Sequence, residues 1–438
     1  MRFSDYLAKS FLAGLDKSLP VLYGLGYIFV VVPALPEREF GLLGLVEVVF
    51  YFILTVESGL VQTPMAKFIA ETASSGWAIP SGFLLSSIVL SSLGVASYAF
   101  GGLLSSLFNA PELTGILWCV PLLLASSYLK NLTSQICIAR HWTGRLVVID
   151  AMYFLGSLAI VVYWGRAGVL SAATHVLLAN IFTACAASLL GVLFTRQVLW
   201  ETTWKIHRHD LRRFLAFGKY SFGANMGAYI NGQLDVILIA HFYGPLHVAL
   251  YRVGKMIYRL YNTFSQALQV ILLPIVSRLD ASGQKDQLRV LYEKSMFFSY
   301  LVLIPLNCGL LLGADWIFFQ LYGGRYQESI PLFRWLVAGT FFLPFGAIGG
   351  NILVGTGNPK LSFRTTWIVV CTYVITSLVL IRAMGIDGAA MATVIAAAAG
   401  AIVTTHYVKT LCSFTLRGIL GRYSDALSFA KGLARGKQ

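Results

Sequence analysis

The chain has 438 residues, of which 57% are hydrophobic and 12% are charged, and its formal net charge is +14. A soluble domain carries about 25% charged residues, so this composition excludes a soluble globular enzyme and indicates a polytopic membrane protein. The basic residues stand in short segments between apolar runs, which is a signal of membrane topology and argues against nucleic acid as a partner.

The first apolar run follows Arg2, Lys9 and Lys17 and has no small-residue cleavage site, so we expect it to remain as a membrane anchor. Runs of about 20 residues, the length that crosses a bilayer, then recur between short loops. We expect twelve spans, near 15–35, 41–63, 79–100, 112–131, 146–165, 169–193, 217–242, 247–274, 295–315, 331–354, 363–384 and 387–409. The predicted fold class is an all-α polytopic membrane protein of about twelve transmembrane helices.

Lys and Arg residues alternate between the two sets of loops. About 25 of the 33 lie on the side that carries both termini, and about five lie on the other side. Because basic residues favour the cytoplasmic side, both termini and the basic segment 194–216 are predicted to be cytoplasmic.

The basic segment also divides the chain into two halves. The predicted parts are an N-terminal six-helix bundle at 1–195, a linker at 196–216, a C-terminal six-helix bundle at 217–409 and a basic tail at 410–438. An offset of 208 residues aligns Glu47 with Lys255, Tyr51 with Arg259, Leu54 with Asn262 and Ser58 with Gln266. Since six helices is an even number, the halves should be related by a pseudo-two-fold axis along the membrane normal.

The eighth predicted span carries a polar stripe. Arg252, Lys255, Arg259, Asn262 and Gln266 follow at steps of three and four, within a sector about 80° wide on one helix face. Three cations on a spanning helix would cost on the order of 7–10 kcal/mol if left unsatisfied. The stripe is therefore predicted to face water, a partner charge or an anionic cargo. Two alternatives are a helix that begins near Met256 and an amphipathic helix that lies flat on the membrane.

Three carboxylates also fall inside predicted spans, Glu47 and Glu57 in the second and Asp235 in the seventh. They are candidates either for carrying a coupling ion or for pairing structurally with the cations of the stripe. Both readings stay open from the sequence.

Catalytic motifs are missing from the sequence. It has no GxxxxGK[ST] phosphate loop, no HExxH and no GxSxG, and its six cysteines form no CxxC pair. We therefore expect no catalytic residue, no metal and no cofactor, and a chain that is not an enzyme.

Several segments carry a family resemblance. They are DVILIAHFYG at 235–244 with ALYRVGKMIY at 249–258, GTGNPK at 355–360 and GIDGAAMATVI at 385–395. In this order the chain resembles the polysaccharide transporters of the multidrug/oligosaccharidyl-lipid/polysaccharide exporter superfamily, the Wzx-type O-antigen flippases. The first half matches less well, because its second span offers carboxylates and no file of cations.

The resemblance implies a flippase that moves an undecaprenyl-pyrophosphate-linked oligosaccharide, an O-antigen or exopolysaccharide repeat, from the inner to the outer leaflet. It would work by alternating access in the bacterial inner (cytoplasmic) membrane, with two bundles around a central cavity. Arg252, Lys255 and Arg259 occupy the helix face whose cations handle pyrophosphate and sugar acids in relatives. The implied partners are the lipid-linked oligosaccharide, membrane lipids, and the polysaccharide polymerase and chain-length machinery.

Rival classes differ in what they require of the sequence. An ion-coupled multidrug or organic-cation antiporter of the same superfamily would place carboxylates at its cargo, which the net-positive stripe disfavours. A membrane polymerase or glycosyltransferase would need a long outer loop or a soluble domain, and the sequence shows neither. A purely structural scaffold is hard to reconcile with charges inside spans.

Overall fold

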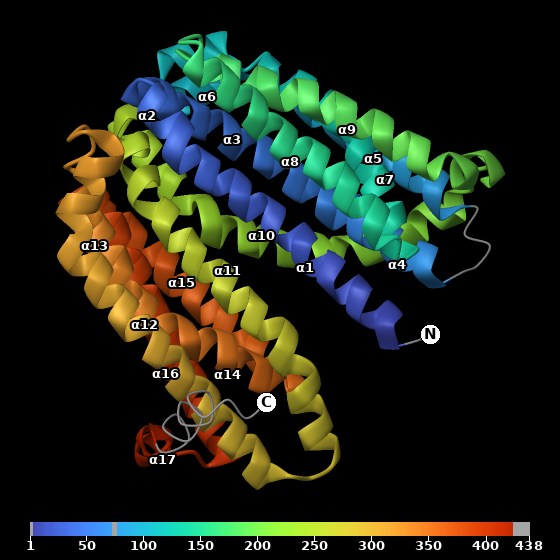
Figure 1. Ribbon diagram of the computed structural model, residues 1–438. Helices are drawn as coiled ribbons and strands as arrows, with labels where there is room; N and C mark the ends of the chain where they lie inside the picture. The colour runs from blue at the N-terminus through green and yellow to red at the C-terminus, as the bar shows by residue number, and fades with distance from the viewer. Residues whose placement is uncertain (1–2, 72–76, 424–438) are drawn as a thin grey trace. The chain divides into compact units, whose positions relative to one another are not determined.

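The computed structural model describes residues 3–71 and 77–423, with side chains described except at 3–11, 13, 257–271 and 359. All regular secondary structure in these ranges is helical (Figure 1). In lipid, every backbone polar group must be satisfied within the protein, and a helix does this within one segment. The expected fold class, an all-α polytopic membrane protein, is confirmed.

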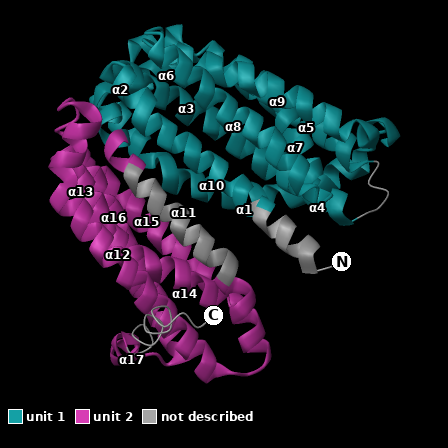
Figure 2. Ribbon diagram, in the orientation of Figure 1, with its two compact units in different colours: residues 1–252 teal, residues 253–438 magenta. Residues whose placement is uncertain are grey.

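The chain divides into two compact units, Met1–Arg252 and Val253–Gln438 (Figure 2). The boundary between the two units falls inside one long helix, between Arg252 and Val253. The proposed repeat of two six-helix halves about the 196–216 segment is a separate matter, and it stays a prediction.

The first unit begins with a helix that contains a π-helical turn, followed by a second helix of the same kind. The elements up to the end of this unit are α1 (Phe3–Gly26), η1 (Tyr27–Val31), α2 (Val32–Ala34), α3 (Glu37–Glu57), η2 (Ser58–Gln62), α4 (Thr63–Glu71), α5 (Ala78–Ala99), α6 (Gly101–Leu107), η3 (Pro111–Gly115), α7 (Cys119–Ala139), α8 (Thr143–Arg166), α9 (Ala173–Glu201) and α10 (Arg208–Tyr243). Helix α3 packs against α5, α7, α9 and α10, so most of its residues are buried, although Tyr51 and Phe52 are exposed.

The remaining elements are α11 (Pro245–Ala281), which begins in the first unit, then α12 (Lys285–Tyr322), α13 (Ser329–Gly339), η4 (Thr340–Phe342), α14 (Leu343–Gly355), α15 (Pro359–Met384), α16 (Ile386–Cys412) and α17 (Leu416–Gly421). In the second unit, α16 packs against α13, α14 and α15. Tyr292, Met296 and Val408 are among the residues that form its apolar core.

Each of the twelve expected spans overlaps a helical segment, but the fourth, expected at 112–131, corresponds to α7 at Cys119–Ala139 and is displaced toward the C-terminus. Within the described ranges, nine segments are both long and apolar enough to cross a membrane. The other three expected spans correspond to α7, α10 and α11, which have 21, 36 and 37 residues. The predicted linker is shorter than expected, because α9 and α10 extend into it and leave only 202–207 outside a helix.

Two π-helical turns, η1 and η2, interrupt otherwise regular spans. Such turns widen the helix locally and occur frequently at functional sites. Here η1 begins with Tyr27 and η2 ends with Gln62, and each of these side chains hydrogen-bonds to a carboxylate of α3. The turns therefore help to position polar groups inside the first unit.

Candidate functional site

Glu47 lies halfway along α3 and is paired with a cation. The Arg252 guanidinium donates to its carboxylate, and the two side chains are only 15% and 6% exposed. The Tyr27 hydroxyl donates to the other carboxylate oxygen at 3.1 Å, and the Phe40 ring centroid lies 5.0 Å from the guanidinium carbon. Their attraction and the further hydrogen bond offset part of the desolvation of both charges, while Nη1 of Arg252 is buried without a hydrogen-bond partner among the described residues.

Two glycines of α3 make room for this pair. A Cβ atom on Gly41 would lie 1.8 Å from the carbonyl oxygen of Pro245, the first residue of α11. A Cβ atom on Gly44 would lie 2.3 Å from Nη1 of Arg252. Small residues let helix backbones approach closely, and here that approach brings Arg252 within reach of Glu47.

The polar network continues into α1, α8 and α9. The Tyr23 hydroxyl lies 3.2 Å from that of Tyr27 and donates to Oδ1 of Asn180 at 2.7 Å. The same oxygen accepts a hydrogen bond from Ser157 at 2.5 Å. Four helices of the first unit are therefore tied together by buried polar groups, which stabilise only when all of them are satisfied.

Glu57, at the end of α3, is fully buried and has a different environment. Its carboxylate accepts hydrogen bonds from the Ser86 hydroxyl and from the Gln62 amide, the latter at 2.8 Å. The Gln135 amide donates in turn to the Gln62 carbonyl oxygen at 3.3 Å. Among the described side chains no Lys or Arg forms an ion pair with Glu57, so neutral donors hold this carboxylate.

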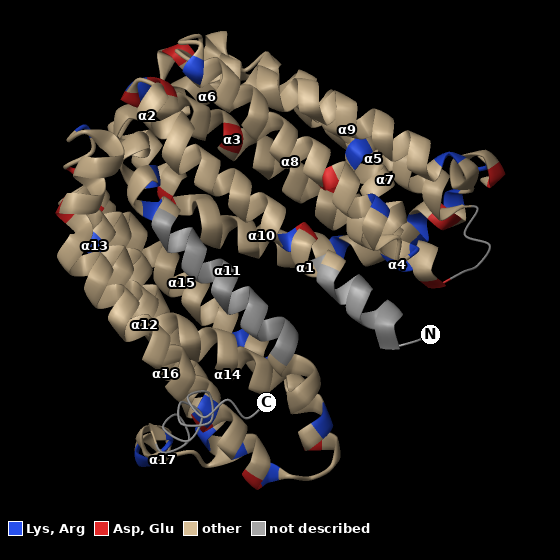
Figure 3. Ribbon diagram, in the orientation of Figure 1, with Lys and Arg blue, Asp and Glu red and all other residues tan. Residues whose placement is uncertain are grey.

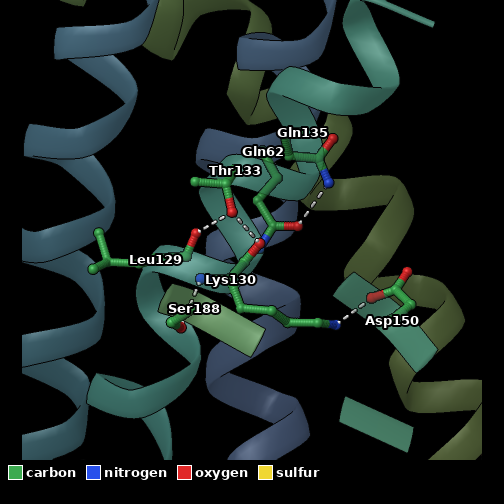
Figure 4. Close-up of polar contacts among 7 residues, drawn as sticks. All are labelled: Gln62, Leu129, Lys130, Thr133, Gln135, Asp150 and Ser188. Carbon is green, nitrogen blue, oxygen red and sulfur yellow. Dashed lines mark hydrogen bonds and ion pairs between the residues drawn. The ribbon is translucent and has the colours of Figure 1, made fainter. Parts of the chain in front are cut away.

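A charged pair, drawn in Figure 4, lies beside this network and lines a polar cavity. The Lys130 ammonium lies 2.8 Å from a carboxylate oxygen of Asp150 and 4.7 Å from the centroid of the Tyr153 ring. The cavity has a volume of about 430 Å³. Its lining residues are Asp16, Lys17, Gln62, Lys130, Asn131, Ser134, Gln135, Cys137, Ile138, His141, Thr143, Leu146 and Asp150.

Asp235 is fully buried in α10. Its carboxylate accepts hydrogen bonds from the Tyr251 hydroxyl and, at 2.8 Å, from the backbone N–H of Val236.

Figure 3 shows most charged residues near the ends of helices and fewer along them. Within the described residues, no group of three or more His, Cys, Asp or Glu side chains could hold a metal ion.

The polar stripe of α11 is only partly described. The helix begins at Pro245, so the alternative in which it starts near Met256 is wrong, and Arg252 lies inside a helix. Lys255 is 9% exposed in the second unit. Arg259, Asn262 and Gln266 lie outside the residues whose side chains the structure describes. The substrate-binding role predicted for all five residues of the stripe stays a prediction.

Sequence reasoning missed several polar residues that the first unit brings together. Lys130 and Asp150 stand near the facing ends of two consecutive expected spans, 112–131 and 146–165. Asn180 and Gln62 are uncharged, so no cost of burial drew attention to them. A usable signal was present, because a Lys and an Asp in adjacent antiparallel spans can pair across a short connection.

A family model described as polysaccharide biosynthesis protein matches residues 34–331. This chain belongs to that family. A probable low-salt glycan biosynthesis flippase of Haloferax volcanii is 27% identical over 204 residues, which are 47% of this chain and 43% of that protein. An uncharacterized membrane protein of Methanocaldococcus jannaschii is 31% identical over 188 residues, 43% of this chain and 37% of that protein. The matches span less than half the length of these curated relatives.

Solved structures show the same fold at low identity. A lipid II flippase in an inward closed conformation has a TM-score of 0.75 at 14% identity, covering 99% of this chain and 93% of that one. An inward-facing multidrug transporter has a TM-score of 0.75 at 15% identity, covering 91% and 94%. A transporter from Pyrococcus furiosus has a TM-score of 0.62 at 17% identity, covering 92% and 94%. These structures share the fold of this chain, and the family model confirms the expected resemblance to a polysaccharide biosynthesis family.

Proposed function

We propose that this protein is a flippase that moves a lipid-linked oligosaccharide across the membrane by alternating access. The family match over residues 34–331 carries the proposal. A relative named as a probable glycan biosynthesis flippase supports it, and so does a fold shared with a lipid II flippase. On this proposal the chain is a transporter and performs no covalent chemistry.

The proposed cargo is an undecaprenyl-pyrophosphate-linked repeat unit, carried from the inner to the outer leaflet of a bacterial inner membrane. Lys255 and Arg259 would hold its pyrophosphate by charge-assisted hydrogen bonds, with Asn262 and Gln266 as further donors. Arg252 is neutralised by Glu47, so we assign it the task of positioning the start of α11. A polysaccharide polymerase and the chain-length machinery would receive the translocated cargo.

Transport is proposed to be passive or driven by an ion gradient. Three carboxylates are candidates for carrying the coupling ion. Glu47 is paired with Arg252, and Asp235 accepts hydrogen bonds from a hydroxyl and a backbone N–H. Glu57 is held by neutral donors, and Gln62 links it to the polar cavity. Glu57 and Asp235 both accept from neutral donors, but among the described contacts only Glu57 is linked through Gln62 to the polar cavity, which favours Glu57 as the carrier.

Proteoliposomes test the proposal directly. They would contain the purified chain and an undecaprenyl-pyrophosphate-linked oligosaccharide with a fluorophore on its glycan. Loss of fluorescence to an impermeant quencher should proceed faster and further than in protein-free vesicles. An equal rate in both, together with uptake of an organic-cation dye, would instead support the antiporter.

A further inference from the structure

The polar cavity of the first unit is large enough for an organic ligand. Its volume of about 430 Å³ falls in the range of small-molecule sites, about 300–1,000 Å³, and is far larger than a bare ion needs. Residues from α1, η2, α7 and α8 line it, together with His141 from the turn between α7 and α8. The cavity therefore lies among four elements that pack into one unit.

The charges around the cavity cancel. Asp16 and Asp150 contribute two carboxylates, and Lys17 and Lys130 contribute two ammonium groups, with His141 counted as neutral. Lys130 is already held by Asp150 at 2.8 Å. A site built for phosphate would carry a surplus of cations, and a site built for Na⁺ would carry a surplus of oxygen ligands without an ammonium among them. A neutral ligand fits this balance better than either ion.

The remaining polar lining consists of hydroxyls and amides, and one of the hydroxyls lacks a hydrogen-bond partner within the described part of the chain. Ser134 is 7% exposed and lines the cavity, yet its hydroxyl has no hydrogen-bond partner among the described residues. A buried hydroxyl without a partner is costly, and a ligand hydroxyl would relieve that cost. The Gln135 amide uses one donor toward Gln62 and has further donor and acceptor capacity.

We infer that this cavity binds one saccharide unit, as the site that recognises the glycan of the cargo. The inference rests on the proposed function and adds a second point of contact to the pyrophosphate-binding stripe. Each sugar hydroxyl both donates and accepts, which matches a lining that mixes carboxylates, ammonium groups, amides and hydroxyls. On the predicted topology the α7–α8 turn is cytoplasmic, so the glycan would be recognised on the side where the cargo is loaded.

Saturation-transfer difference NMR on the purified full chain in nanodiscs tests the site. The probes are the methyl glycosides of glucose, galactose, mannose and N-acetylglucosamine, with oligosaccharides released by mild acid from the lipid extract of the host. We expect signal from at least one saccharide, unaffected by added NaCl or pyrophosphate. No saccharide signal, or a signal that either salt abolishes, would overturn the inference in favour of an empty cavity or an ion site.

A matched pair of variants locates the binding. Gln135→Leu removes a lining amide, and Gln197→Leu makes the same change at an exposed position of α9. Loss of one good hydrogen-bonding group should weaken saccharide binding about five- to ten-fold in the first variant and leave it unchanged in the second. If Gln135→Leu fails to fold, the near-isosteric Thr143→Val takes its place. Equal binding in the cavity variant and the control would contradict the assignment.

The flippase assay on the same variants separates this inference from the proposed function. Movement of lipid-linked oligosaccharide without any saccharide binding in the cavity would refute the site and leave the function standing. The unmodified protein could instead bind saccharide, lose that binding in Gln135→Leu and still move no lipid-linked oligosaccharide. That outcome would uphold the site and refute the function.

Discussion

The Arg252 guanidinium donates to the Glu47 carboxylate and joins the first turns of α11 to the middle of α3. The two residues stand 205 positions apart in the chain. Both charges are largely removed from water, so each depends on the other for compensation. A buried pair of this kind contributes little net stability over an apolar pair, but losing one partner is expensive.

The first prediction concerns that pair. Glu47→Leu or Arg252→Leu should each destabilise the protein by about 3–5 kcal/mol, because the remaining charge stays buried without its partner. The double variant should lose much less than the sum of the two. Unfolding of the four proteins in one detergent gives the coupling energy of a double-mutant cycle. Additive losses would mean that the two charges do not compensate each other.

The second prediction concerns the close approach at α3. Gly41→Ala should destabilise the protein more than Gly44→Ala, because its methyl group meets the backbone carbonyl of Pro245 and not a movable side chain. Gly227→Ala is the control, since a Cβ there has open space within 4 Å. That control should gain up to about 1 kcal/mol from helix propensity. Melting temperatures decide the order, and equal values for the three variants would refute it.

The third prediction concerns the pyrophosphate site. Arg259→Ala should abolish surface polysaccharide at normal protein levels, and Arg259→Lys should be partly tolerated because the charge remains without the planar fork. Immunoblots of polysaccharide and of the tagged protein measure both. The charge swap Arg259→Asp with Asp235→Arg should not restore export, because Asp235 is already satisfied by Tyr251 and Val236. Restored export would show that Arg259 serves as an ion-pair partner.

The fourth prediction concerns coupling. Glu57→Gln keeps the shape of the side chain, but an amide does not ionise and so cannot bind and release a proton. An imposed proton gradient should accelerate flipping by the unmodified protein and have little effect on this variant. Initial rates in proteoliposomes, with and without proton and sodium gradients, measure this. A wild-type rate that is indifferent to both gradients would remove any coupling role for Glu47, Glu57 and Asp235.

The fifth prediction concerns topology. Reporter domains inserted at 202–207, between α9 and α10, should be cytoplasmic, and those at 323–328, between α12 and α13, should be on the outer side. The reason is the asymmetric distribution of Lys and Arg between the two sets of loops. Activities of paired reporters that work on opposite sides of the membrane check both positions. A reversed pair of activities would contradict the twelve-span orientation.

The sequence by itself determined the fold class and the membrane residence. Apolar runs of about 20 residues recur along the chain, and in lipid such runs form helices because no water satisfies their backbone groups. It also identified the three carboxylates inside spans, since a charge among apolar residues is conspicuous without any structure. The family resemblance followed from local motifs, which a single sequence contains in full.

Only the tertiary structure decided what each buried charge faces. Helical spacing places Arg252 on a face of α11, but its partner Glu47 comes from another helix, and Gly41 and Gly44 of that helix allow the approach. The cavity beside Lys130 likewise takes its lining from elements far apart in the chain. Periodicity reports on one helix at a time, whereas compensation of a buried charge depends on groups within a few ångströms on neighbouring helices.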